Sequence, residues 1–192
     1  LSDPTIMVMK MFKTKIRTKD GLEILLREPK ASDLKEFLRH INKQVEDRTE
    51  GLGINKKKTL KEEREWLKSV LHDVRTKKKV FLVFEHNGKI AGSCEVRRKE
   101  GLSDHIAMFG VGMEKEYRRQ GIGTQVLPIL FKLAKKRMKG LRIIALDVYS
   151  FNKPAQGLYK KVGFRKVATI PDGAMLKGKL YDQYLMYYYL RR

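Results

Sequence analysis

The chain has 192 residues and a mass of 22.4 kDa, which is about one domain and enough to bury a core without disulfides or metals. Its composition, 42% hydrophobic and 34% charged, is typical of a globular protein and excludes an intrinsically disordered chain. The single cysteine, Cys94, excludes a disulfide framework and a cysteine-based zinc site. No apolar run reaches the roughly 18 residues of a membrane span, and there is no signal-peptide pattern, so we expect a cytoplasmic protein with no membrane partner.

The net charge is +21 at pH 7, from 43 Lys and Arg against 22 Asp and Glu. Residues 1–96 carry 22 basic and 15 acidic side chains, whereas residues 97–192 carry 21 and 7. So large a positive charge attracts polyanions such as nucleic acid or phosphorylated small molecules. The basic clusters are short, as at Lys56–Lys58 and Lys135–Arg137, and a solvated surface is the simpler explanation for them. The charge alone therefore leaves a polyanionic partner open.

Twelve secondary-structure elements are expected in the order β-β-α-α-β-β-β-α-β-α-β-β. Alternating residues predict the strands, and apolar residues at helical spacing predict the helices. Asn87-Gly88 supplies a tight hairpin turn, Thr59 and Asn152 are expected to cap helices, and Pro128 is expected to kink a helix or remove one of its hydrogen bonds. The expected ranges are 12–18, 22–27, 34–45, 60–75, 80–85, 89–98, 105–113, 121–139, 142–148, a short helix after residue 152, 164–170 and 184–190.

No repeat or Pro/Ser/Gly-rich linker divides the chain, so residues 12–192 are expected to form one domain. Residues 1–11 lie before the first expected strand, and the chain does not begin with Met. We interpret this segment as an N-terminal extension or a remnant of cloning.

The strongest chemical signal is the segment Tyr117-Arg-Arg-Gln-Gly-Ile-Gly-Thr124, between an expected strand and an expected helix. Gly121 and Gly123 let the backbone approach a ligand closely, and the helix start presents unpaired N–H groups and a positive dipole end. This combination favours a pyrophosphate. The segment is neither a P-loop, because no Lys-Ser/Thr follows, nor a dinucleotide fingerprint, because Val126 replaces the third glycine.

A second motif, Asn152-Lys-Pro-Ala-Gln-Gly-Leu-Tyr-Lys-Lys-Val-Gly-Phe164, follows the next strand. Together the two motifs resemble the GNAT superfamily of N-acetyltransferases, in its branch of ribosomal-protein-alanine acetyltransferases, over about residues 21–190. The resemblance implies an α+β fold, a three-layer α-β-α sandwich with about four helices. Its mixed, mostly antiparallel sheet would have about seven strands and would splay between the family's fourth and fifth strands, here residues 105–113 and 142–148.

The resemblance also implies acetyl-coenzyme A as cofactor, with its pantetheine arm in the splayed part of the sheet. The expected contacts fall into four groups along the coenzyme. They are Gly110, Val111, Gly112 and Met113 for the pantetheine; Arg118, Arg119, Gln120, Gly121, Ile122, Gly123 and Thr124 for the pyrophosphate; Asn152, Ala155 and Tyr159 for the thiol end; and Lys160 for the 3′-phosphate.

Acetyl transfer to an amine needs a neutral nucleophile and a proton for the departing thiolate. Tyr159, two helical turns after the Asn152 cap, is the expected general acid. For the base, His105 stands where several family members have a catalytic Glu or His. The alternatives are Glu46 and Glu50, which would bind a cationic substrate or pass its proton through water. Whether Glu95 faces the cleft depends on the strand register. Cys94 is expected to be a small core residue rather than a nucleophile.

The expected reaction is direct attack by a primary amine in a ternary complex. The acceptor would be a protein N-terminus, a lysine or a polyamine, and a ribosome- or nucleic-acid-associated substrate would suit the charge. The alternative is a noncatalytic acetyl-coenzyme A sensor or a basic nucleic-acid-associated protein on the same scaffold, because a fold does not fix function. The sequence leaves open whether the protein is a monomer or a homodimer.

Overall fold

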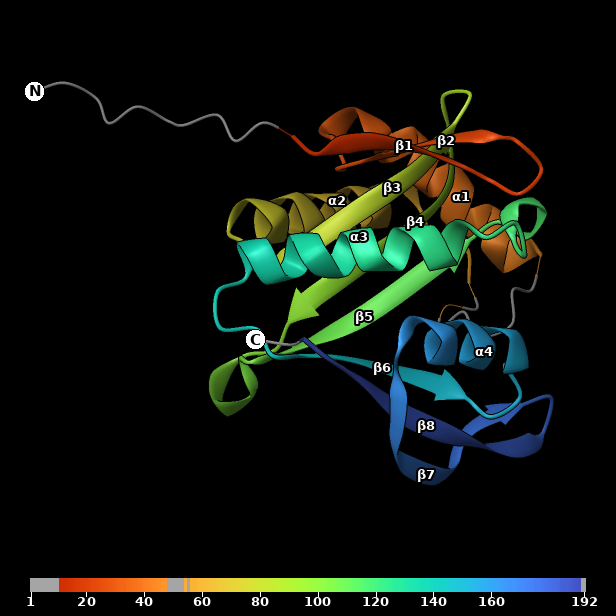
Figure 1. Cartoon of the computed structure of the whole chain (residues 1–192). Helices are drawn as coiled ribbons and strands as arrows, with labels where there is room; N and C mark the ends of the chain where they lie inside the picture. Colours follow the sequence, from red (N-terminus) through yellow and green to blue (C-terminus); the bar gives the residue numbers. More distant parts are fainter. Residues whose placement is uncertain (1–10, 48–53, 55, 191–192) are drawn as a thin grey trace, which may run out of the picture.

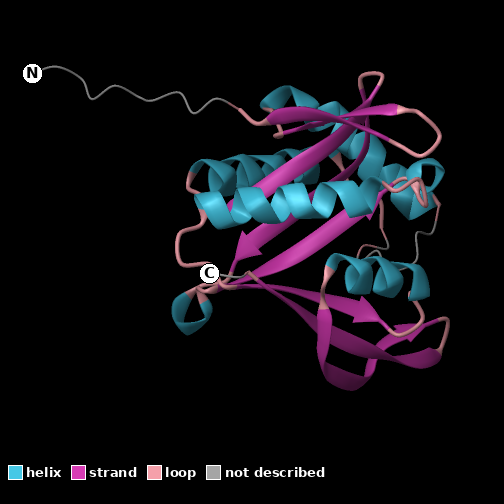
Figure 2. Cartoon of the chain, viewed as in Figure 1, coloured by secondary structure: helices cyan, strands magenta, loops and turns pink. Residues whose placement is uncertain are grey.

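We describe residues 11–47, 54 and 56–190 of a computed structural model (Figures 1 and 2). The expected N-terminal extension therefore lies almost wholly outside the described residues. Four α-helices and eight strands follow the expected order, with three short 3-10 turns between them. The elements are β1 Lys13–Arg17, β2 Glu23–Arg27, α1 Leu34–Glu46, α2 Leu60–Arg75, β3 Lys79–His86, β4 Lys89–Arg98, β5 Ile106–Met113, α3 Ile122–Arg137, β6 Ile143–Tyr149, α4 Lys153–Val162, β7 Arg165–Leu176 and β8 Lys179–Tyr189.

Helices cover both faces of the central sheet, as Figure 1 shows. The reason is visible in β3, whose successive side chains point to opposite faces and are almost all apolar and buried. Val80, Leu82 and Phe84 join the core under α3, whereas Phe81 and Val83 join the smaller core under α1 and α2. The expected three-layer α-β-α sandwich is confirmed.

The sheet order is β1-β2-β3-β4-β5-β6-β8-β7. All neighbouring strands are antiparallel except β5 and β6, which run parallel. These two strands pair only at their starts, over the residues Ile106–Met108 of β5 and Ile143–Ala145 of β6. Beyond that seam they diverge, so residues 109–113 and 146–149 face each other without pairing (Figure 1). The expected splay is therefore present, between the fifth and sixth strands of this chain.

The sheet has eight strands where the resemblance implies about seven. The largest difference from the expected ranges is the last hairpin, whose strands are much longer because residues 171–183 belong to it. Helix α3 runs through Pro128 as one helix, and Pro128 withholds one backbone donor from it. Within the described residues, no helix combines the length and apolar character that crossing a membrane requires.

Candidate active site

The turn before α3 carries two residues in the left-handed backbone conformation. Gly121 has φ +79° and Arg119 has φ +63°. Glycine adopts this conformation at little cost, whereas a side chain such as that of Arg119 makes it unfavourable and uncommon. Such strain is concentrated at ligand-binding turns, and here it precedes the unpaired amides of the first turn of α3. The turn is therefore shaped to present backbone N–H groups to an anion.

Two side chains of this segment, Arg118 and Thr124, stabilise the conformation of the turn through hydrogen bonds to backbone carbonyl oxygens. Arg118 donates from Nε and Nη2 to the carbonyl oxygen of Met113, at 2.9 and 2.8 Å, and so ties the turn to the end of β5. Thr124 Oγ1 donates to the carbonyl oxygen of Gly121 at 2.8 Å. Ile122 is buried in the core, so only its backbone can face a ligand. Arg119 is exposed and can contribute its charge.

Gly123 lies where α3 approaches α4 closely. A Cβ atom at this position would stand 2.7 Å from Cδ2 of Leu158 on α4. Gly92 on β4 is constrained more strongly, because a Cβ there would stand 2.6 Å from the carbonyl oxygen of Gly112. The two glycines therefore set the spacing of the helices and strands that border the splay.

A chain of buried polar groups connects α1 to the open part of β5. His40 Nδ1 lies 3.0 Å from Glu114 Oε1, and Gln44 Nε2 lies 2.8 Å from His40 Nε2. An ionised carboxylate can only accept, so we assign the His40 proton to Nδ1, and His40 Nε2 accepts from the Gln44 amide. The Gln44 side chain lies over Gly112, since a Cβ there would be 3.4 Å from both Gln44 Nε2 and Gln44 Oε1.

Glu114, 4% exposed, is the hub of this network. Arg39 Nη1 donates to its Oε1 at 2.8 Å and Lys43 Nζ donates to its Oε2 at 2.9 Å. Burial alone would raise the pKa of Glu114, but the hydrogen bonds from His40, Lys43 and Arg39 outweigh it and lower the pKa to about 2. Glu114 is therefore ionised at neutral pH and fixes the orientation of His40.

Two buried side-chain oxygens within the described residues have no hydrogen-bond partner, Gln44 Oε1 and Gln120 Oε1. Both are on the path expected for the coenzyme: Gln120 is in the turn before α3, and Gln44 covers Gly112. A buried acceptor without a partner costs about 1–3 kcal/mol. Two such acceptors along one path fit a ligand that carries N–H or O–H donors.

Asn152 caps α4 as expected, with its Oδ1 accepting from the Ala155 amide at 3.3 Å. Two turns further on, the ring of Tyr159 packs edge-on against Phe109, with ring centroids 5.9 Å apart. Phe109 is the first residue of β5 after the seam with β6. Tyr159 is therefore held at the apex of the splay. Its burial raises the pKa of the phenol to about 12, so it keeps its proton at neutral pH.

The structure does not bring His105 to the splay. His105 precedes β5, and its carbonyl oxygen accepts from Arg142 and Ile143 at the paired end of the strands. Seven residues of extended chain, about 23 Å, separate it from Gly112. Glu46 ends α1, is exposed and pairs with Lys57 at 2.6 Å. Glu50 lies outside the described residues.

The register settles the position of Glu95. It pairs with Gly110, and its Cγ lies 3.7 Å from where a Cβ of Gly110 would stand. Lys79 Nζ holds its carboxylate at 2.7 Å. Its neighbour Cys94 is buried in the core under α3, and burial raises the pKa of its thiol well above the usual value, as expected of a core residue. Glu95 is thus a carboxylate at the splay, on the face that α1 and α2 cover.

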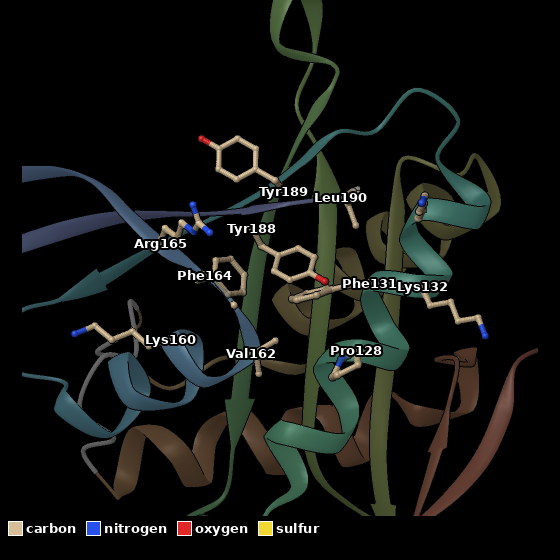
Figure 3. A pocket seen from close by; sticks show the side chains of 12 residues that line it. Pro128, Phe131, Lys132, Lys160, Val162, Phe164, Arg165, Tyr188, Tyr189 and Leu190 are labelled. Carbon is tan, nitrogen blue, oxygen red and sulfur yellow. The ribbon is translucent and has the colours of Figure 1, made fainter. Parts of the chain in front are cut away.

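Lys160 is exposed on α4 and borders two surface hollows. The larger is a groove of about 860 Å³ between the second half of α3, the end of α4 and the ends of β7 and β8 (Figure 3). The residues of α3 that line this groove follow Gly123 by 5 residues at Pro128 and by 12 at Lys135, or about 8 to 18 Å along the helix.

The chain matches the acetyltransferase (GNAT) family over residues 42–164. It is 32% identical over 84 residues to the ribosomal protein bS18-alanine N-acetyltransferase of Escherichia coli, which is 44% of this chain and 53% of that protein. The chain spans about half the length of the curated relatives it matches.

Solved structures share the whole fold. A GNAT acetyltransferase from Streptococcus pneumoniae superposes with a TM-score of 0.77 at 24% identity, over 87% of this chain and 99% of that one. The ribosomal L7/L12 α-N-protein acetyltransferase RimL, in complex with coenzyme A, superposes with a TM-score of 0.75 at 15% identity, over 87% of this chain and 94% of that one. With the family match covering more than half of the chain and the splayed sheet in place, this chain belongs to the GNAT family of acetyltransferases.

Proposed function

We propose that the chain is an N-acetyltransferase that moves an acetyl group from acetyl-coenzyme A to a primary amine. The observation that carries this is the pair of orphaned oxygens, Gln44 Oε1 and Gln120 Oε1, which lie along the splay and the turn. The coenzyme has amide and hydroxyl donors along its arm and a pyrophosphate at its other end, so its chemistry matches both places. Its thioester supplies the activated acetyl group.

Along this path, the amides of Gly121–Thr124 and the exposed Arg119 would hold the pyrophosphate. The unpaired edge of β5 from Phe109 to Met113 would hydrogen-bond the pantetheine arm as a strand does. These contacts orient the thioester towards the apex of the splay, where Tyr159 stands. Lys160 follows Tyr159 on α4 and so lies near the thiol end of this path, which argues against the contact with the 3′-phosphate expected from the sequence.

The residues at the apex of the splay fit the proton transfers that accompany acetyl transfer from the thioester to the amine. Attack by a neutral amine forms a C–N bond and breaks the C–S bond, and the departing sulfur takes the electron pair. Tyr159 Oη, protonated at neutral pH, supplies the proton that this sulfur needs. Glu95, which lies beside Gly110, would receive the proton that the amine loses, directly or through water. The Tyr159 hydroxyl then recovers a proton from solvent.

For the acceptor we propose the α-amine of a protein N-terminus. The E. coli relative and RimL are both named for acetylating ribosomal proteins, the first at an alanine and the second at an α-amine. Glu46 and Glu50 remain candidates for binding a cationic peptide. A lysine or polyamine acceptor would use the same chemistry.

The proposal is tested first by binding. Acetyl-coenzyme A at millimolar concentration should raise the melting temperature, and the absence of a shift would remove the cofactor assignment. Tyr159→Phe should then lower kcat on an alanine-initiated peptide at least 100-fold, the lower bound for general acid catalysis. Its affinity for the coenzyme should stay unchanged. Tyr187→Phe on β8 is the matched control, and equal kcat in the two variants would exclude Tyr159 as the acid.

A further inference from the structure

The turn between β1 and β2 lies beside the turn before α3, although the two are far apart in the sequence (Figure 1). The backbone N–H of Lys19 donates to the carbonyl oxygen of Gln120 at 3.1 Å. On the first turn of α3, Gln125 Nε2 donates to the carbonyl oxygen of Arg17 at 2.9 Å. Because Gln120 stands between the two residues with positive φ, the hairpin braces the turn at its strained part.

The hairpin turn is itself held in one conformation. The buried hydroxyl of Thr18 accepts from the Leu22 amide at 2.9 Å, and the Thr18 carbonyl oxygen accepts from the Gly21 amide at 3.1 Å. Gly21 has φ +83°, which glycine adopts at little cost. Lys19 therefore extends from a fixed backbone, and its side chain always starts from the same place beside the turn before α3.

The side chain of Lys19 runs across Gly121, the residue that precedes α3. A Cβ atom at Gly121 would stand 3.5 Å from Lys19 Cγ and 3.6 Å from Lys19 Cε. Lys19 Nζ is one bond of about 1.5 Å further on, so it lies within about 5 Å of that position. The ammonium group is therefore at the N-terminal end of α3, next to the backbone amides that are proposed to hold the pyrophosphate.

Within the described residues, no carboxylate neutralises Lys19. On the same hairpin Lys15 pairs with Glu23 at 2.6 Å, whereas neither Lys19 nor its neighbour Asp20 forms an ion pair in that part of the chain. The first turn of α3 has no acidic residue either. The N-terminus of a helix carries about half a positive elementary charge, so a cation beside it is unfavourable until an anion binds. The position of Lys19 therefore fits a bound phosphate group.

We propose that Lys19 is a further coenzyme-binding residue, whose ammonium group contacts the pyrophosphate. The proposal rests on the coenzyme path given above, in which the amides of Gly121–Thr124 hold that group. It adds a cation from a hairpin that neither sequence motif contains. Lys160 does not supply this charge, because it lies near the thiol end of the same path.

The test is isothermal titration calorimetry of the full chain with coenzyme A, at low salt and at about 1 M salt. Lys19→Met keeps a stem that can pack on Gly121 and removes the charge, so its melting temperature without ligand should equal that of the parent. Its affinity should fall about fivefold or more at low salt, whereas Lys19→Arg, which keeps the charge, should stay within about twofold of the parent. The loss in Lys19→Met should shrink at about 1 M salt, where the screening length is about 3 Å.

Lys13→Met is the matched control. It removes the same charge from the exposed start of β1, six residues or about 20 Å from Lys19, and should bind coenzyme A as the parent does. Unchanged affinity in Lys19→Met, or an equal loss in Lys13→Met, would overturn the proposal.

A second ligand, 3′-dephospho-coenzyme A, separates the two phosphate positions of the coenzyme. Equal losses by Lys19→Met for the two ligands would support the contact with the pyrophosphate, and a loss confined to coenzyme A would overturn it in favour of the 3′-phosphate. Failure of the parent chain to bind either ligand would refute the coenzyme path together with the role of Lys19. Binding by the parent with no effect of Lys19→Met would refute the role of Lys19 alone, so the two failures are read separately.

Discussion

Replacing Glu114 by glutamine should cost the native state about 3 kcal/mol at pH 7. The hydrogen bonds from His40, Lys43 and Arg39 hold the pKa of Glu114 at about 2, against its usual 4.5. At about 1.4 kcal/mol per unit of pKa, the folded state favours the ionised carboxylate by about 3 kcal/mol. Because the pKa is lowered on folding, this stabilisation is complete above about pH 5 and is lost as the pH falls from 4.5 towards 2.

The assay is urea denaturation of the parent and of Glu114→Gln at pH 7 and at pH 2.5. The two free energies of unfolding should differ by about 3 kcal/mol at pH 7 and by much less at pH 2.5. Glu116→Gln is the control: this carboxylate also contacts Lys43 but its side chain is 56% exposed, so its loss should cost below about 1 kcal/mol. Equal costs for the two substitutions, or a difference that does not change with pH, would refute the reasoning.

Three further substitutions separate binding from folding. Gly121→Ala should destabilise the chain by about 1–2 kcal/mol and weaken coenzyme binding, because alanine is strained at φ +79°; Gly157→Ala, in open space on α4, should not destabilise it. Gln44→Leu should weaken coenzyme binding about fivefold or more, because it removes the unpaired oxygen on the assigned path; it also removes the donor to the buried His40 Nε2 and should lower the melting temperature, so the affinity is measured well below the unfolding transition. Unchanged affinity would contradict the assigned path. Thr59→Ala should cost about 1 kcal/mol in urea denaturation and leave coenzyme binding intact, because Thr59 and Glu62 form a capping box.

Local signals in the sequence predicted those elements whose ends are set by short-range chemistry. Helix α2 begins after the Thr59 cap and ends at Arg75, as expected, and α4 begins after Asn152. The strand Lys89–Arg98 after the Asn87-Gly88 turn has its expected bounds. The extension of the last hairpin was missed because Pro171, Gly173 and Gly178 are typical of loops, and because β7 is exposed along almost its whole length and shows no alternation. A bulge between Ile170 and Ala174 accommodates the irregular segment.

The candidate site was predictable where a motif is contiguous, as in the turn before α3, and not where the fold assembles it. Gln44 and His40 are four residues apart on α1, but Glu114 is 70 residues further along the chain, and no local pattern connects them. The sequence predicted His105 at the start of a strand that the structure begins at Ile106, and only the pairing of β5 with β6 shows that His105 lies at the closed end. Glu95 required the register with β5, which depends on tertiary packing.

Only three residue pairs join β5 to β6, and the packed core under α3 makes the rest of the connection between the two parts of the sheet. On one side lie β1 to β5 with three helices, and on the other β6 to β8 with α4. A ligand lying along the parted strands would fasten both sides, so its binding energy would add to the cohesion of the whole protein. At a hundredfold excess over its dissociation constant this amounts to about 2.7 kcal/mol. The lifetime of the protein against proteolysis, and not its catalytic rate alone, would then follow the supply of the coenzyme.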